Sequence, residues 1–189
     1  MTNHATWHLR RAAGILRRGG IIAYPTEAVF GLGCDPENGD AARRLLALKS
    51  RDISQGLILI AAGFSQLRPF VEPLCQGHMR VIRASWPGPV TWILPARQTT
   101  PKYLTGRHAS LAVRVSAEPS VVALCERFGG ALVSTSANVS GHPPARTALD
   151  VRRYFGRRLD YILPGSVGGQ RRPSEIRDGS TGRVLRPGS

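Results

Sequence analysis

The chain has no apolar stretch long enough to cross a membrane. Its longest run of apolar and small residues, Gly56 to Phe64, is less than half of the roughly 20 residues that a transmembrane helix needs. The first residues, Met1 to Arg18, also lack the continuous apolar segment of a secretory signal, because polar and charged side chains interrupt them. We therefore expect a cytoplasmic protein with no membrane partner.

Cysteine is scarce as well. Cys34, Cys75 and Cys125 are the three cysteines of the chain, and their wide spacing excludes a CxxC metal or redox pair. Three thiols cannot form a fully paired disulfide framework, so reduced and mostly buried cysteines are expected.

The common nucleotide and hydrolase signatures are missing. The chain contains no GxGxxG, GxxxxGK[ST], HExxH or GxSxG motif. If the protein binds phosphate, it does so without a Walker loop.

Acidic residues are few, and lysine occurs only at positions 49 and 102. Asp and Glu number 12 against 26 Lys and Arg, which gives a formal net charge of +14. Such a surplus attracts polyanions such as RNA or nucleotide phosphates, although a single surface arginine is as well explained by solvation. Paired arginines occur at Arg10-Arg11, Arg152-Arg153, Arg157-Arg158 and Arg171-Arg172. A non-catalytic module that binds double-stranded RNA or tRNA is therefore an alternative, although aromatic residues that could stack on bases make up only 6%.

The remaining composition is that of a globular protein, and its hydrophobic pattern alternates between strand and helix. Hydrophobic residues make up 42% of the chain, enough for one core in a single domain over residues 1–189. Helices are expected at 7–18, 41–49 with Asp40 as N-cap, 120–128 and 147–155, and strands at 21–24, 56–61, 90–94, 111–115, 131–135 and 161–163. Glycine pairs at 19–20 and 129–130 would end two of these helices. The pattern predicts an α/β fold with an open, twisted, mixed sheet and flanking helices.

Two segments are less regular. Residues 30–35 look like a glycine-bearing loop that follows a strand. Residues 164–189 are rich in Gly, Arg, Pro and Ser, so they form either a loose tail or a loop that folds over a ligand.

Four polar groups follow or interrupt the expected strands and helices, where open α/β sheets gather ligands. Thr26 and Glu27 follow the first strand, and Lys49-Ser50-Arg51 closes a helix with two cations that either stabilise its dipole or hold phosphate. Ser134 to Gly141 is denser in hydroxyl groups than a turn requires. Arg114 lies in the middle of a strand, pointing either to solvent or into a crevice where it could grip a carboxylate.

In this order and spacing, these groups resemble the YrdC/TsaC threonylcarbamoyl-AMP synthases, in their short bacterial form. The matching pieces are Tyr24-Pro25-Thr26-Glu27, Phe30 to Asp35, Lys49-Ser50-Arg51, Trp86 to Thr91, Leu111 to Val115, Ser134 to Gly141 and Leu185 to Gly188. The resemblance implies a single YrdC-like domain with a deep basic cavity. It also implies a nucleotidyltransferase that converts L-threonine, bicarbonate and ATP into threonylcarbamoyl-AMP and pyrophosphate, for N6-threonylcarbamoyladenosine formation at position 37 of tRNA by downstream transfer proteins.

The resemblance also assigns residues, without a protein nucleophile. It implies that ATP contacts Lys49, Arg51, Ser136, Asn138 and Arg186, and that threonine contacts Thr26, Arg114, Ser134 and Ser174. Mg²⁺ would bridge the phosphates, although no carboxylate cage for it is evident.

Overall fold

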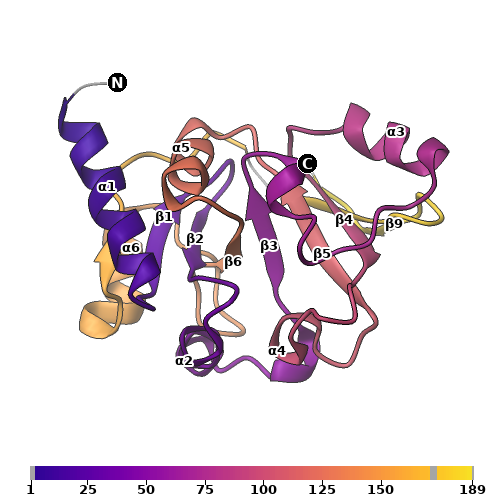
Figure 1. Ribbon diagram of the computed structural model, residues 1–189. Coiled ribbons are helices and arrows are strands. Elements are labelled where there is room, and N and C mark those ends of the chain that lie inside the picture. Colours follow the sequence, from indigo (N-terminus) through magenta and orange to yellow (C-terminus); the bar gives the residue numbers. More distant parts are fainter. Residues whose placement is uncertain (1–2, 171–173, 189) are drawn as a thin grey trace.

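The structure is a computed structural model, and it describes residues 3–170 and 174–188 (Figure 1). The Arg171-Arg172 pair lies outside these residues. The helices are α1 (Asn3–Arg17), α2 (Gly39–Lys49), α3 (Gln76–Ala84), α4 (Lys102–Thr105), α5 (Pro119–Phe128) and α6 (Ala148–Phe155). The strands are β1 (Ile22–Pro25), β2 (Phe30–Gly33), β3 (Ile58–Ala61), β4 (Val90–Pro95), β5 (Ser110–Val115), β6 (Leu132–Ser136), β7 (Tyr161–Ile162), β8 (Glu175–Asp178) and β9 (Val184–Arg186).

The described strands form one sheet in the order β7-β1-β2-β6-β3-β5-β4-β8-β9. The pairs β7/β1, β3/β5 and β4/β8 are parallel, and the other neighbours are antiparallel. The prediction of a mixed open sheet with flanking helices is thus confirmed. No helix in the described ranges combines the length and apolar character of a membrane span.

The sheet has a hydrophobic core on each face, because alternate residues of a strand point to opposite sides. On one face, Leu16 of α1 and Leu124 of α5 pack with Ile60 and Leu132. On the other face, α2, α3, α4 and α6 contribute to a larger core that includes Leu45, Leu59, Ile82, Leu104, Val113, Val133 and Phe155. The two helices α1 and α5 cover only part of their face, which leaves room for a cavity.

The predicted N-cap of α2 is wrong. The helix begins two residues earlier than expected, and Asn38 caps it by accepting a hydrogen bond from the backbone N–H of Ala41 (2.9 Å). Asp40 lies in the first turn instead, where a negative charge is favourable beside the N-terminal dipole, and it pairs with Arg43. The predicted glycine stops are confirmed, since Gly19 (φ 77°) and Gly129 (φ 97°) take the left-handed conformation after α1 and α5.

Several elements were not expected from the sequence. Residues 30–33 form β2 rather than a loop, and α3 and α4 were not predicted. The loose-tail alternative is wrong for much of the C-terminal segment, because β8 pairs with β4 in parallel register and β9 pairs with β8.

Of the three free cysteines, Cys34 and Cys125 are buried as expected, whereas Cys75 is exposed.

Candidate active site

A cavity of about 470 Å³ lies on the sheet face that α1 and α5 leave partly uncovered. Ile60 packs under these helices, and Ile58, two residues earlier on β3, points to the same side and lines the cavity. In register with Ile58 and Ile60 stand Ser134 of β6 and Ala112 and Arg114 of β5. The cavity has the size of a typical small-molecule site.

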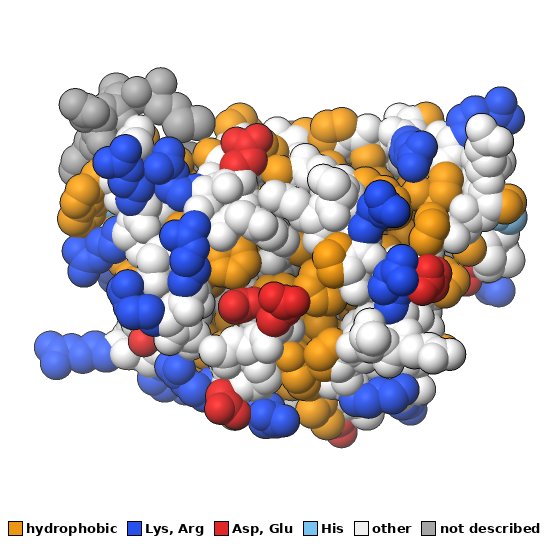
Figure 2. Space-filling model, viewed as in Figure 1, with side chains coloured by type: hydrophobic (Ala, Val, Ile, Leu, Met, Phe, Trp, Pro, Cys, Tyr) orange, Lys and Arg blue, Asp and Glu red, His pale blue; other side chains and the backbone are white. Residues whose placement is uncertain are grey.

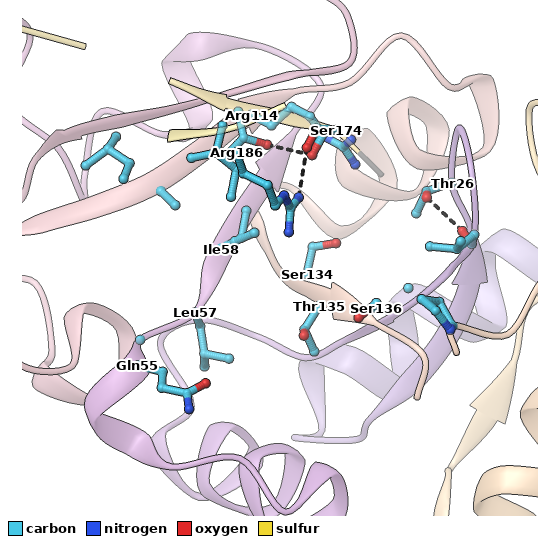
Figure 3. Close-up of a pocket in the computed structure, with 18 of the residues that line it drawn as sticks. Thr26, Gln55, Leu57, Ile58, Arg114, Ser134, Thr135, Ser136, Ser174 and Arg186 are labelled. Atoms are coloured by element: carbon cyan, nitrogen blue, oxygen red, sulfur yellow. Dashed lines mark hydrogen bonds between the residues drawn. The ribbon is translucent and has the colours of Figure 1, made fainter. Parts of the chain in front are cut away.

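The labelled residues in Figure 3 divide the cavity into two ends. Arg114, Arg186 and Ser174 lie together at one end, Gln55 and Leu57 lie at the other, and Ser134, Thr135 and Ser136 of β6 lie along the side toward Thr26. Seven of the nine residues named from the sequence line this cavity: Thr26, Arg51, Arg114, Ser134, Ser136, Ser174 and Arg186.

Arg114 points into this cavity and not to solvent. Its residue surface is only 9% exposed, and its Nη2 lies 3.2 Å from Glu27 Oε2. Because the ion pair joins β5 to the turn after β1, it closes one wall of the cavity. The solvated alternative for Arg114 is therefore wrong.

Arg51 reaches the cavity because of the way α2 ends. Ser50 takes the left-handed conformation (φ 51°), which turns the chain directly after Lys49. Arg51 then donates from Nε and Nη2 to the carbonyl oxygen of Gly56 at 3.2 and 3.1 Å. Burial lowers the pKa of Arg51, and the guanidinium lines the cavity.

Lys49 and Asn138 do not line the cavity. The Lys49 side chain is buried, and its Nζ donates to the carbonyl oxygens of Ser136 and Asn138 and to Asn138 Oδ1. Ser136 Oγ also donates to Asn138 Oδ1 at 2.6 Å. Burial, followed by the nearby charge of Arg51, lowers the pKa of Lys49 to about 8. Lys49 therefore stabilises the loop after β6 through these hydrogen bonds, on the side of the loop away from the cavity.

The C-terminal segment supplies two of the predicted residues, Ser174 directly before β8 and Arg186 in β9. Ser174 Oγ and Thr91 Oγ1 share a hydrogen bond (2.9 Å between the oxygens), and Arg186 donates to the carbonyl oxygen of Ser174 (2.8 Å), as the dashed lines in Figure 3 show. Burial and then the nearby charge of Arg114 lower the pKa of Arg186. Segments that are far apart in the sequence thus meet at one end of the cavity.

Some polar lining residues were not assigned to ATP or threonine from the sequence. Glu27, Thr91, His108 and Gln170 belong to this group. Glu27 stands beside Thr26 in the motif that follows β1, which was the available signal, but nothing local indicated its pairing with Arg114. Thr91 likewise lies in the Trp86 to Thr91 piece of the resemblance, whereas no pattern in the sequence singled out His108 or Gln170.

The charged side chains in the cavity wall favour an anionic ligand. Among the described residues that line the cavity are three arginines, Arg51, Arg114 and Arg186, and one acidic residue, Glu27. Hydroxyl groups of Thr26, Ser134 and Ser136 add neutral donors and acceptors. Within the described residues, no group of three or more His, Cys, Asp or Glu side chains is placed to hold a metal ion. Such a cavity suits a molecule with phosphate or carboxylate groups.

Comparison with known proteins identifies the family of this fold. The family model for Sua5/YciO/YrdC, described as telomere recombination, matches residues 14–188. The chain belongs to the Sua5/YciO/YrdC family. Two relatives named threonylcarbamoyl-AMP synthase, from Halorhodospira halophila and Nitrosococcus oceani, are 57% and 58% identical over 95% of this chain, which corresponds to 94% and 97% of their own lengths.

A solved member of the Sua5/YciO/YrdC family has the same fold. The structure of P. abyssi Sua5 complexed with L-threonine superposes with a TM-score of 0.90 at 32% identity. The match covers 96% of this chain and 54% of the Sua5 chain, so this chain spans about half of that longer protein.

Proposed function

We propose that the protein is an L-threonylcarbamoyl-AMP synthase, a nucleotidyltransferase that uses L-threonine, bicarbonate or CO₂, and ATP. The observation that carries this proposal is the 57–58% identity to synthases of that name along 95% of the chain. The cavity supports it, because arginines and hydroxyl groups converge where a polyphosphate and an amino acid could lie side by side.

The reaction needs positioning more than a protein nucleophile. The threonine ammonium loses a proton to water, the neutral amine adds to the carbon of CO₂, and a second N–H proton passes to water as the carbamate anion forms. A carbamate oxygen then attacks the α-phosphorus of ATP, the bond to the bridging oxygen breaks, and pyrophosphate leaves with its electron pair. Fixed cations that stabilise the phosphate charge and a wall that aligns the two substrates supply the catalysis.

The residues of the cavity divide between the two substrates. We assign Thr26, Arg114, Ser134 and Ser174 to threonine, with the Arg114 guanidinium binding the carboxylate by its planar fork. We assign Arg51, Ser136 and Arg186 to ATP. Lys49 and Asn138 belong to the ATP side through the loop after β6, whose carbonyl groups Lys49 binds.

The cavity does not fit a magnesium ion held by protein carboxylates. Glu27, the one acid among the described lining residues, already accepts a hydrogen bond from Ser116 and pairs with Arg114. ATP would therefore enter with any Mg²⁺ coordinated by its own phosphate oxygens and water, as is common for this metal.

The product would serve N6-threonylcarbamoyladenosine formation at position 37 of tRNA, through separate transfer proteins. The net charge of +14 also favours contact with tRNA itself. On the face shown in Figure 2, basic side chains are spread over several parts of the surface, and a group of acidic side chains lies near the middle. Because the relatives that are 57% and 58% identical are named as synthases, an RNA-binding module without catalysis is the weaker candidate.

Release of pyrophosphate tests the proposal. We expect pyrophosphate only when ATP, threonine and bicarbonate are all present, and omission of either threonine or bicarbonate should reduce it to the background. Thermal unfolding separates the alternative: ATP plus threonine should stabilise a synthase even at high salt, where binding through RNA phosphates weakens. Release that is independent of threonine and bicarbonate would reject the synthase.

A further inference from the structure

We propose that Glu27 is a positioning residue, which fixes the Arg114 guanidinium in the orientation that receives the carboxylate of threonine. This inference rests on the proposed function, since it concerns the threonine end of the same cavity. It starts from the one buried acid in the wall of a cavity that otherwise gathers arginines.

The carboxylate of Glu27 is held from several sides. The residue is 6% exposed, and its Oε1 accepts a hydrogen bond of 2.6 Å from Ser116 Oγ, which belongs to a completely buried serine. Ser116 is fixed in turn, because its Oγ accepts a bond from the Glu118 backbone N–H (3.1 Å). The Glu27 carbonyl oxygen accepts a bond from Gln170 N–H (3.0 Å). The hydrogen bonds to its side chain and backbone therefore fix the position of Glu27.

The second carboxylate oxygen faces only Arg114. Glu27 Oε2 is sealed from solvent and has no hydrogen-bond partner among the described residues, but it lies 3.2 Å from Arg114 Nη2. A buried charge needs a partner of opposite sign, so each of these two side chains restricts where the other can stand. An arginine held in one rotamer loses less freedom when its ligand arrives.

The same geometry argues against Glu27 as the base that takes the proton of the threonine amine. A base must come within hydrogen-bonding reach of that proton. Oε1 is occupied by Ser116, and Oε2 is closed off from the cavity by its burial. Glu27 therefore acts through Arg114 and not on the substrate.

Glu27→Gln tests this role, because glutamine keeps the shape and can still accept the bond from Ser116 but loses the charge that holds Arg114. We expect the threonine KM to rise about tenfold, with kcat and the ATP KM within about twofold of wild type. Glu118→Gln is the matched control. Burial and then the nearby charge of Glu27 raise the pKa of Glu118, so this acid is close to Glu27, but Arg114 forms its ion pair with Glu27 and not with Glu118. The threonine KM of the Glu118→Gln variant should stay unchanged. A fall in kcat without a change in threonine KM would overturn the positioning role and point to a base.

A double-mutant cycle separates the pair from general structural damage. Arg114→Ala leaves Glu27 as a buried, unpaired charge and should lower Tm, and adding Glu27→Gln should restore part of that loss. In the Arg114→Ala background, Glu27→Gln should produce no further rise in threonine KM. Additive effects on both quantities would overturn the inference.

Two further results keep the test decisive. If Glu27→Gln does not fold, Ser116→Ala replaces it: this change removes the support of Oε1, keeps both charges, and should raise the threonine KM in the same direction. An unchanged value would overturn the inference. An inactive wild type would reject the proposed function and this inference with it, whereas an active wild type with an unchanged threonine KM in Glu27→Gln would reject the inference alone.

Discussion

Arg114 illustrates how the surroundings of one residue decide its role. The same guanidinium on the opposite side of β5 would point into the core that contains Val113. At its actual place it stands on the cavity side of the sheet, in register with Ile60 and paired with Glu27. Its planar fork is therefore available to a carboxylate.

Arg114→Lys should impair threonine binding selectively, since lysine keeps the charge but loses the fork. We expect the threonine KM to rise about tenfold to a hundredfold while the ATP KM holds, as for the loss of a charge-assisted hydrogen bond. Arg97→Lys is a control, because Arg97 forms a comparable ion pair with Glu72 at the surface. Steady-state kinetics that vary each substrate separately provide the measurement, and a threonine KM equal to that of wild type would remove Arg114 from the carboxylate site.

Lys49 carries a prediction on pH. Its pKa falls from 10.5 to about 8 in the fold, so between these values the unfolded chain binds more protons than the folded one. The contribution of Lys49 to the free energy of unfolding therefore increases as pH rises from about 8 to 10.5, by up to about 3 kcal/mol.

Comparison with Lys49→Met isolates this contribution. Burial also raises the pKa of Cys34 and Cys125 to about 12, which lowers stability with rising pH above their ordinary values, but it does so in both proteins. The difference in unfolding free energy between wild type and Lys49→Met should thus increase with pH. A difference that stays constant from pH 7 to 10.5 in denaturant titrations would contradict the lowered pKa.

At the scale of elements, the C-terminal strands connect fold and site. β8 extends the sheet beside β4, and β9, which is exposed and pairs only with β8 in the described sheet, carries Arg186 to the cavity. If nucleotide binds Arg186, the β8/β9 hairpin should open less often.

Limited trypsin digestion measures this opening. We expect cleavage after Arg183, in the exposed turn between β8 and β9, to slow several-fold when ATP is present. Cleavage after Arg127, at the exposed end of α5 and outside the cavity wall, should keep its rate and serves as the internal control. Equal protection of both sites, or of neither, would contradict a closure by the C-terminal strands.

The elements that the sequence predicted are those with strong local signals. The apolar periods of α1, α2, α5, β3 and β5 and the glycines at 19 and 129 are properties of neighbouring residues. β2 was missed because its glycines read as a loop, yet a Cβ at Gly33 would lie 2.6 Å from the carbonyl oxygen of Val133 and 2.7 Å from Tyr24 Cε1. Close packing with distant strands, which no local pattern encodes, requires glycine there.

The candidate site was predictable to a similar extent. The hydroxyl-rich segment after β6 and the cations after α2 could be located from their place next to strands and helix ends. The pairing of Glu27 with Arg114 and the meeting of Ser174 with Thr91 depend on the sheet order, because β8 and β4 are far apart in the sequence. The position of Lys49 at the end of α2 was predicted correctly. The hydrogen bonds of its Nζ to the carbonyl oxygens of Ser136 and Asn138 could not be predicted.

At the scale of the whole molecule, the charge and the fold act together. A net charge of +14 raises the local concentration of anions such as ATP around the protein. Among the described residues, Arg51, Arg114 and Arg186 place positive charge in the cavity wall. The match to P. abyssi Sua5 extends over 96% of this chain, and the family model matches residues 14–188, so the residues that line the cavity lie within the matched region.

Isotope tracing of the product tests the central claim most directly. The protein is incubated with ATP, threonine and ¹³C-labelled bicarbonate, and the adenylate is analysed by mass spectrometry. The account predicts threonylcarbamoyl-AMP that carries a single ¹³C in its carbamoyl group, formed in step with pyrophosphate. Pyrophosphate release with an unlabelled adenylate of threonine, or with no adenylate, would contradict it.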